Sequence, residues 1–163
     1  MRTLAVFAVA LIAAGCSPSG TGPVSFRSPA GWTGKHQTTA GIDFYSVTTG
    51  ASGPGLLMFA PWPNPSRPED IPTLVQQLAE GFPKEAKRSG VALASERYRI
   101  EQFTGSHCQG TYAMFQIGAA GTTIVQAMFM MSVDGRVWNG QFTGSEDDWK
   151  RALTLLRSIK KNG

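Results

Sequence analysis

The sequence has few charged residues and few of the groups that carry out chemistry. Asp, Glu, Lys and Arg make up 16% of its 163 residues, against roughly 25% in an average soluble protein. Its two histidines and two cysteines are not spaced as H-x-x-x-H, H-E-x-x-H or C-x-x-C, the usual spacings of metal and redox sites. G-x-S-x-G, G-x-x-x-x-G-K-[ST] and G-x-G-x-x-G are also absent, which gives no indication of a serine hydrolase or a nucleotide site. We therefore expect no metal, no cofactor and no catalytic residue.

Long basic runs are missing as well. The formal net charge is +4, and no cluster of cations exceeds the pair Lys160-Lys161, so nucleic-acid binding is not predicted. The chain is instead 42% hydrophobic, with nine Phe, four Trp, 19 Gly and 10 Pro. This composition excludes a disordered chain and favours one turn-rich, sheet-dominated globular domain.

The N-terminus has the pattern of a secretory signal peptide. Arg2 precedes an apolar run from Leu4 to Ala14, and Gly15 and Cys16 follow. The run is too short to span a ~30 Å hydrocarbon core, so we expect residues 1–15 to be removed.

The segment Ala13-Ala14-Gly15-Cys16 resembles a bacterial lipobox, with Ala13 where Leu is usual. The resemblance implies that Cys16 becomes the first mature residue, carries acyl chains such as palmitate, and anchors the protein stably to a membrane. Ser17, in place of Asp, implies the outer membrane, facing the periplasm, if the host is Gram-negative. Residues 16–23 are then the lipidated Cys and a flexible tether, and residues 24–163 are a single domain.

Lipidation of Cys16 would leave Cys108 unpaired. One hypothesis is a reactive thiol assisted by His107. Successive residues of a strand point to opposite faces, however, and free Cys is among the most buried residue types. A buried, inert Cys108 is therefore the favoured interpretation.

Alternating and continuous apolar segments predict a series of strands. The Leu56–Ala60 run indicates a strand covered on both faces, and so does Thr122–Val133. Asp134-Gly135 predicts a tight hairpin, whereas Thr33–Thr39, which contains His36, is interpreted as a solvated polar loop. The other predicted strands are Val24–Ser28, Gly41–Thr48, Ala92–Phe103, Gln109–Ile117 and Arg136–Phe142.

Two helices are predicted. The first begins near Asp70 and ends near Lys87, with apolar residues at helical spacing. The second follows Ser145, an N-cap whose partner is Asp148. Two helices on opposite sides of one antiparallel sheet would give an α+β fold arranged as an α/β/α sandwich.

The loop from Pro61 to Pro68 contains four prolines and Trp62. A stiff loop of this kind could present Trp62 to a protein partner, together with Asn64, Arg67 and an exposed Trp32 nearby. The alternative is that Trp62 folds back onto the edge of the core.

Several short motifs form a recognisable set: Phe26, Pro29, Gly31 and Trp32 near the start, Asp134-Gly135-Arg136 in the hairpin, and Leu156, Ser158 and Ile159 at the end. Together they resemble the PsbP-like superfamily, which includes a photosystem II extrinsic protein, a Ran-binding nuclear import factor and bacterial lipoproteins. The resemblance implies an antiparallel sheet flanked by helices and a binding or assembly role without catalysis.

We therefore expect a non-catalytic, periplasm-facing lipoprotein whose partner is another protein, either an envelope component or a toxin. One version is an immunity protein that inhibits a cell-wall-degrading toxin. The alternatives are a small-ligand or lipid carrier and a thiol enzyme that uses Cys108.

Overall fold

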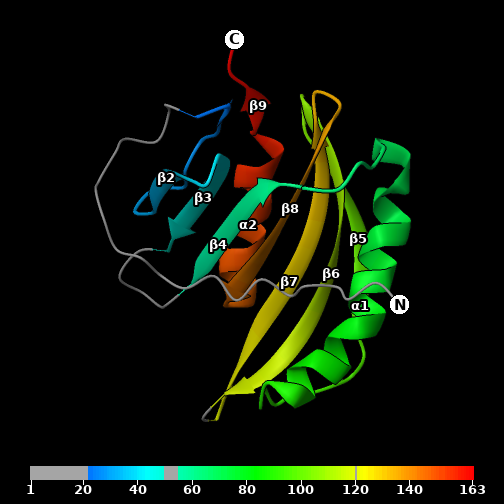
Figure 1. Ribbon diagram of the computed structural model, residues 1–163. Helices are drawn as coiled ribbons and strands as arrows, with labels where there is room; N and C mark the ends of the chain where they lie inside the picture. The colour runs from blue at the N-terminus through cyan, green and yellow to red at the C-terminus, as the bar shows by residue number, and fades with distance from the viewer. Residues whose placement is uncertain (1–21, 50–54, 120) are drawn as a thin grey trace.

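The computed structural model describes residues 22–49, 55–119 and 121–163. The expected signal peptide and Cys16 lie outside these residues. In the described ranges, no helix is long and apolar enough to cross a membrane. The elements, shown in Figure 1, are β1 (Val24–Ser25), β2 (Thr33–Thr39), β3 (Ile42–Thr48), β4 (Leu56–Pro61), the 3-10 turn Pro68–Asp70, α1 (Ile71–Arg88), β5 (Arg99–Thr104), β6 (Cys108–Ala119), β7 (Thr122–Val133), β8 (Arg136–Gly144), α2 (Glu146–Arg157) and β9 (Lys160–Lys161).

Seven strands form one antiparallel sheet in the order β2-β3-β4-β8-β7-β6-β5. The chain leaves the middle of the sheet after β4 and passes through α1 to the far edge at β5. It then returns through β6 and β7 until β8 pairs with β4. The predicted α+β fold with a flanked antiparallel sheet is confirmed.

Each helix buries its apolar stripe on a different face of this sheet. α1 packs on β6 and β7 through Ile71, Val75 and Ala79. α2 packs on the other face through the predicted stripe, whose members Trp149, Ala152, Leu153, Leu156 and Ile159 are all buried. The two apolar clusters lie wholly within residues 24–159, so the domain carries its own core.

The local signals for the turn and the second helix are confirmed. Asp134 and Gly135 have φ values of 47° and 82°, as a two-residue hairpin turn between β7 and β8 requires. The Ser145 hydroxyl accepts a hydrogen bond from the backbone N–H of Asp148 at 3.1 Å, which satisfies one free donor of the first turn of α2.

One loop prediction was wrong, and two strand predictions were wrong in part. Thr33–Thr39 is strand β2 and not a loop. The expected strand Val24–Ser28 is reduced to Val24–Ser25, which pairs with β9 outside the main sheet. The expected strand from Ala92 begins only at Arg99, apart from one isolated bridge between Leu93 and Ile117.

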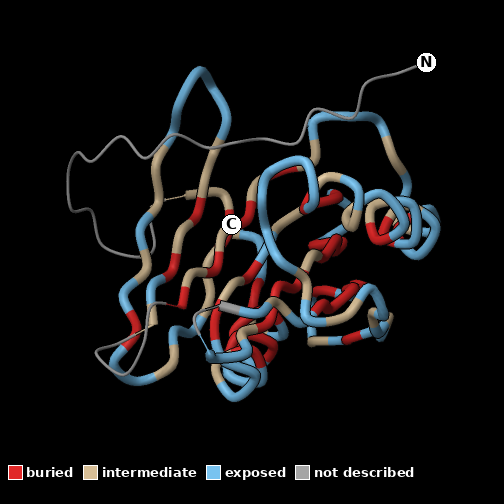
Figure 2. The backbone as a smooth tube through the Cα atoms, turned by 90° about the horizontal axis from the view of Figure 1, so that it is seen from below, coloured by how far each residue is buried: buried red, intermediate tan, exposed pale blue. Residues whose placement is uncertain are grey.

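The prediction for β4 was wrong on one face. Leu57 and Phe59 are buried under the α2 side, but Leu56, Met58 and Ala60 on the α1 side are only half-buried. The same alternation runs along the neighbouring strands and is visible in Figure 2 as alternating red and tan segments. One half of the sheet therefore has a face that neither helix covers.

Candidate functional site

The proline-rich loop folds back toward the core. Trp62 is half-buried and packs against the apolar cluster under α1. Its backbone N–H donates to the carbonyl of Val137 at 2.9 Å, and its indole N–H donates to the Ser66 hydroxyl at 3.1 Å. Of the two hypotheses for Trp62, the geometry matches the one in which the side chain closes the edge of the core.

The other predicted binding residues do not gather around Trp62. Asn64 and Arg67 are exposed on the same loop, and the Arg67 guanidinium lies 3.8 Å from the Glu69 carboxylate. Trp32 was expected to be exposed near this loop, and that was wrong. It is 7% exposed and belongs to the cluster on the α2 side, with the Arg151 guanidinium 5.0 Å from its ring centroid. The sheet therefore separates the two tryptophans.

The uncovered half of the sheet is a broader candidate surface. We call it the open face: the α1-side surface of β2, β3, β4 and the part of β8 after Val137. Figure 1 shows α1 beside β5, β6 and β7, away from this half of the sheet. By strand alternation and register, its side chains are those of Thr33, Lys35, Gln37, Thr39, Ile42, Phe44, Ser46, Thr48, Leu56, Met58, Ala60, Asn139, Gln141 and Thr143.

The open face is amphipathic and has little charge. One register row places Lys35 beside Ser46, Ser46 beside Met58 and Met58 beside Gln141. The apolar members are half-buried, except Ile42, which is 39% exposed. Lys35 is its only charged residue. Depletion of charge together with partly accessible aromatic and Met side chains is typical of the core of a protein–protein interface.

Strand β2, which forms the outer edge of the open face, is held to the sheet by a polar contact that sequence reasoning missed. The imidazole Nε2 of His36 lies 2.8 Å from the Asp43 carboxylate, and the His36 ring stacks on Tyr45 with centroids 4.7 Å apart. The signal available in the sequence was the pair Ala40-Gly41, a two-residue turn that joins Thr33–Thr39 to the alternating segment Ile42–Thr48 of equal length. Every residue from Thr33 to Thr39 is polar or glycine, so the segment lacks the apolar alternation that would have indicated a strand.

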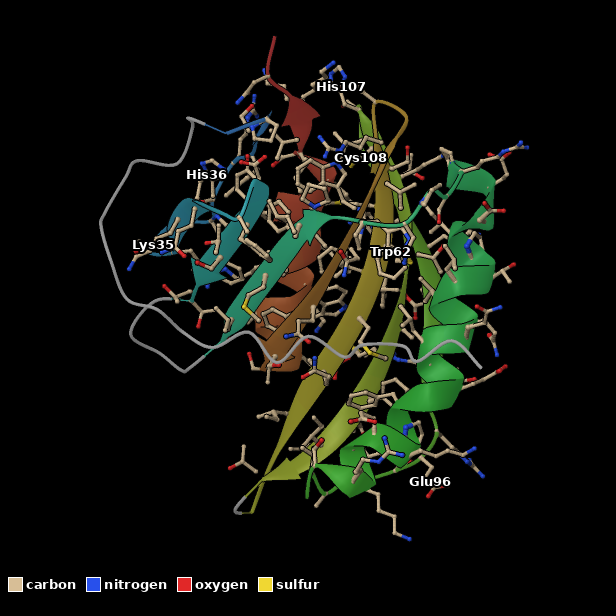
Figure 3. All side chains as sticks on the ribbon, viewed as in Figure 1. Lys35, His36, Trp62, Glu96, His107 and Cys108 are labelled. Carbon is tan, nitrogen blue, oxygen red and sulfur yellow. The ribbon has the colours of Figure 1, made fainter. Side chains whose placement is uncertain are left out.

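Cys108 and His107 diverge as expected, although His107 lies in the loop before β6 and not in the strand. Cys108 is 6% exposed, and its Sγ lies 3.1 Å from the Leu156 carbonyl oxygen. Burial raises the pKa of this thiol, which disfavours the thiolate. His107 is exposed, with its Nδ1 4.0 Å from the Asp134 carboxylate. Figure 3 shows its side chain pointing out of the end of the molecule.

The described ranges hold no group of three or more His, Cys, Asp or Glu side chains arranged to bind a metal ion. Cys16, the predicted lipidation site, falls before the first described residue. The candidate site considered below is the open face.

No family model matches the chain, and no curated protein matches it. Two solved structures share its fold, which is an α+β fold of the PsbP-like type. One is the solution structure of cyanobacterial PsbP (CyanoP) from Synechocystis sp. PCC 6803, with a TM-score of 0.50 and 14% identity over 91% of this chain and 98% of that chain. The other is a crystal structure from Bacteroides thetaiotaomicron VPI-5482, with a TM-score of 0.52 and 12% identity, covering 86% of this chain. The match spans 46% of the Bacteroides chain, which is less than half its length.

Proposed function

We propose that this protein is a non-catalytic, lipid-anchored envelope protein that binds another protein through the open face. The single observation that supports the proposal is the charge-poor, partly apolar sheet surface that no helix within the described residues covers. Half-buried Phe44 and Met58 would supply apolar contact area there. Gln37, Asn139 and Gln141 would supply hydrogen bonds around them.

The anchor in this proposal is Cys16. Acylation would hold the domain at a membrane, which for a Gram-negative host is the outer membrane on its periplasmic side. Replacement of Cys16 by Ser should move the protein from the membrane fraction to the soluble fraction. Retention of the Cys16→Ser protein in the membrane fraction after extraction at high salt would refute the anchor.

A capture experiment tests the open face with a matched pair of variants. Gln141 is exposed on β8 within the open face, and Gln77 is exposed on the outer surface of α1. Residues 17–163 are used as bait in envelope extract, as wild type, as Gln141→Arg and as Gln77→Arg. We expect a partner retained by the wild type and by Gln77→Arg, and depleted at least tenfold by Gln141→Arg.

The identity of the partner separates the versions of the proposal. An envelope protein would indicate an assembly factor, and a cell-wall-degrading toxin would indicate an immunity protein. If all three baits retain the same proteins equally, the open face is not the binding surface. If native mass spectrometry instead finds a co-purified small molecule or lipid, the carrier hypothesis replaces this one.

A further inference from the structure

A shallow cleft lies at the end of the domain where the described chain begins. It has a volume of about 610 Å³ and is lined by residues of β1 and the turn after it, the β5–β6 loop, the end of α2 and β9: Ser25, Phe26, Arg27, Ser106, His107, Thr154, Arg157, Ser158 and Lys160. None of these residues carries a carboxylate. Figure 3 places His107 at this end, beside β9.

The cations of the cleft are available to a ligand. Within the described part of the chain, Arg27, Arg157 and Lys160 form no ion pair, whereas Arg88, Arg99, Lys150 and Arg151 each lie against a carboxylate. Asp134 does not line the cleft; its carboxylate lies 4.0 Å from Nδ1 of the lining residue His107 and accepts a hydrogen bond from the backbone N–H of Lys161 at 3.3 Å. Guanidinium and ammonium groups beside free hydroxyls are the donors that bind phosphate.

Two of the last four carbonyls of α2 have hydrogen-bond partners within the fold. A helix C-terminus carries a partial negative charge because its last carbonyls lack partners. Here the Leu155 carbonyl accepts from the Ser158 backbone and hydroxyl, and the Leu156 carbonyl accepts from the Ile159 backbone and from Cys108. These two carbonyls are therefore occupied within the fold, and the guanidinium of Arg157 adds a positive charge to the last turn.

The position of the chain start places the cleft near the expected membrane. The carbonyl oxygens of Gly22 and Pro23 accept hydrogen bonds from Asn162, directly after β9. Cys16 precedes Gly22 by six residues, which extend to at most about 20 Å. The acidic first turn of α2 lies at the opposite end of that helix, so α2 carries its acids away from the cleft and Arg157 at the cleft.

We propose that this cleft binds the phosphate of an anionic phospholipid headgroup and so orients the domain on the membrane that holds it. The inference rests on the proposed lipid anchor for the proximity of the membrane, but the binding itself needs no acyl chain. Arg27, Arg157 and Lys160 contact the phosphate, with the hydroxyls of Ser25 and Ser106 as additional donors.

The test uses residues 17–163 without lipid, which contain both apolar clusters. Co-sedimentation is measured with vesicles of phosphatidylcholine alone and with vesicles containing about a third phosphatidylglycerol. The cleft variant is Arg157→Gln with Lys160→Gln. The control variant, Lys84→Gln with Arg97→Gln, removes the same charge from exposed residues outside the cleft.

Since each basic residue near an anionic surface contributes about 1 kcal/mol, we expect the cleft variant to lose about 10- to 30-fold in affinity for anionic vesicles and the control to lose less than threefold. Circular dichroism checks that both variants are folded. Equal losses in the two variants, or equal binding to both kinds of vesicle, would overturn the proposal. Saturable binding of inorganic phosphate without vesicle binding would also overturn it and assign the cleft to a soluble phosphate. Because no partner protein is present, failure here is separate from failure of the capture experiment.

Discussion

Gly140 provides a direct test of the sheet order and of the packing under α2. It lies in β8 opposite Phe129 of β7 and Phe59 of β4. A Cβ placed on Gly140 would lie 2.3 Å from Cζ of Phe129 and 2.4 Å from the backbone oxygen of Met58. The Met58 carbonyl is fixed by strand pairing, and Phe129 is 1% exposed, so neither neighbour has room to move.

Gly140→Ala should therefore destabilise the domain. Overpacking of a close-packed core costs roughly 1–3 kcal/mol. A loss of about 2 kcal/mol, with a urea dependence of about 2 kcal/mol per molar, lowers the urea midpoint by about 1 M. The unfolding transition can be followed by tryptophan fluorescence, because Trp149 lies close to Phe129, with ring centroids 6.3 Å apart.

Gly118→Ala is the matched control. Gly118 lies in β6 outside the positive-φ region, and a Cβ placed on it meets nothing within 4 Å. Ala should be neutral or stabilise by about 0.4–1 kcal/mol, because it restricts the unfolded chain. If Gly140→Ala is as stable as Gly118→Ala, the pairing of β4, β8 and β7 around this residue is refuted.

Three further predictions concern single groups. In residues 17–163, the Cys108 thiol should react with a thiol reagent only after denaturation, and rapid reaction of the native protein would restore the thiol-enzyme hypothesis. Burial, and next the hydrogen bond to Glu101, raise the pKa of Tyr112 to about 12, above the unfolded value of about 10. The neutral phenol therefore stabilises the folded state fully below about pH 10, and this contribution is lost as the pH rises through about 12. The fall in the urea midpoint above about pH 10 should therefore be smaller in Tyr112→Phe than in wild type, and identical falls would contradict this assignment. Ser145→Ala removes the acceptor of the Asp148 backbone N–H and should cost roughly 0.5–2 kcal/mol in urea unfolding, and an unchanged midpoint would show that this cap does not stabilise α2.

The open face and the basic cleft lie at different places on the domain, and each suits a different ligand. The open face is nearly uncharged and can bury apolar area against a protein. The cleft is cationic and lies beside the start of the described chain. A domain oriented on its membrane by the cleft would present the open face at a defined angle to a partner in the same compartment.

The sequence by itself determined the features that depend on neighbouring residues. The Asp134-Gly135 turn follows from the φ > 0 requirement of a two-residue hairpin. The start of α2 follows from the Ser145 cap, and its buried face follows from apolar residues spaced at helical period. The fold class followed from the order of these elements, together with the PsbP-like resemblance.

Only the tertiary structure decided the features that join distant segments. Strand β2 is polar enough to be mistaken for a loop, and its pairing with β3 and the contact between His36 and Asp43 identify it as a strand. Trp62 and Trp32 are close to proline and glycine turns in sequence, yet the sheet places them on opposite faces. The open face exists because α1 crosses to β6 and β7 and leaves β4 half-covered. The cleft is assembled from three separate stretches of the sequence, so no local pattern could have predicted it.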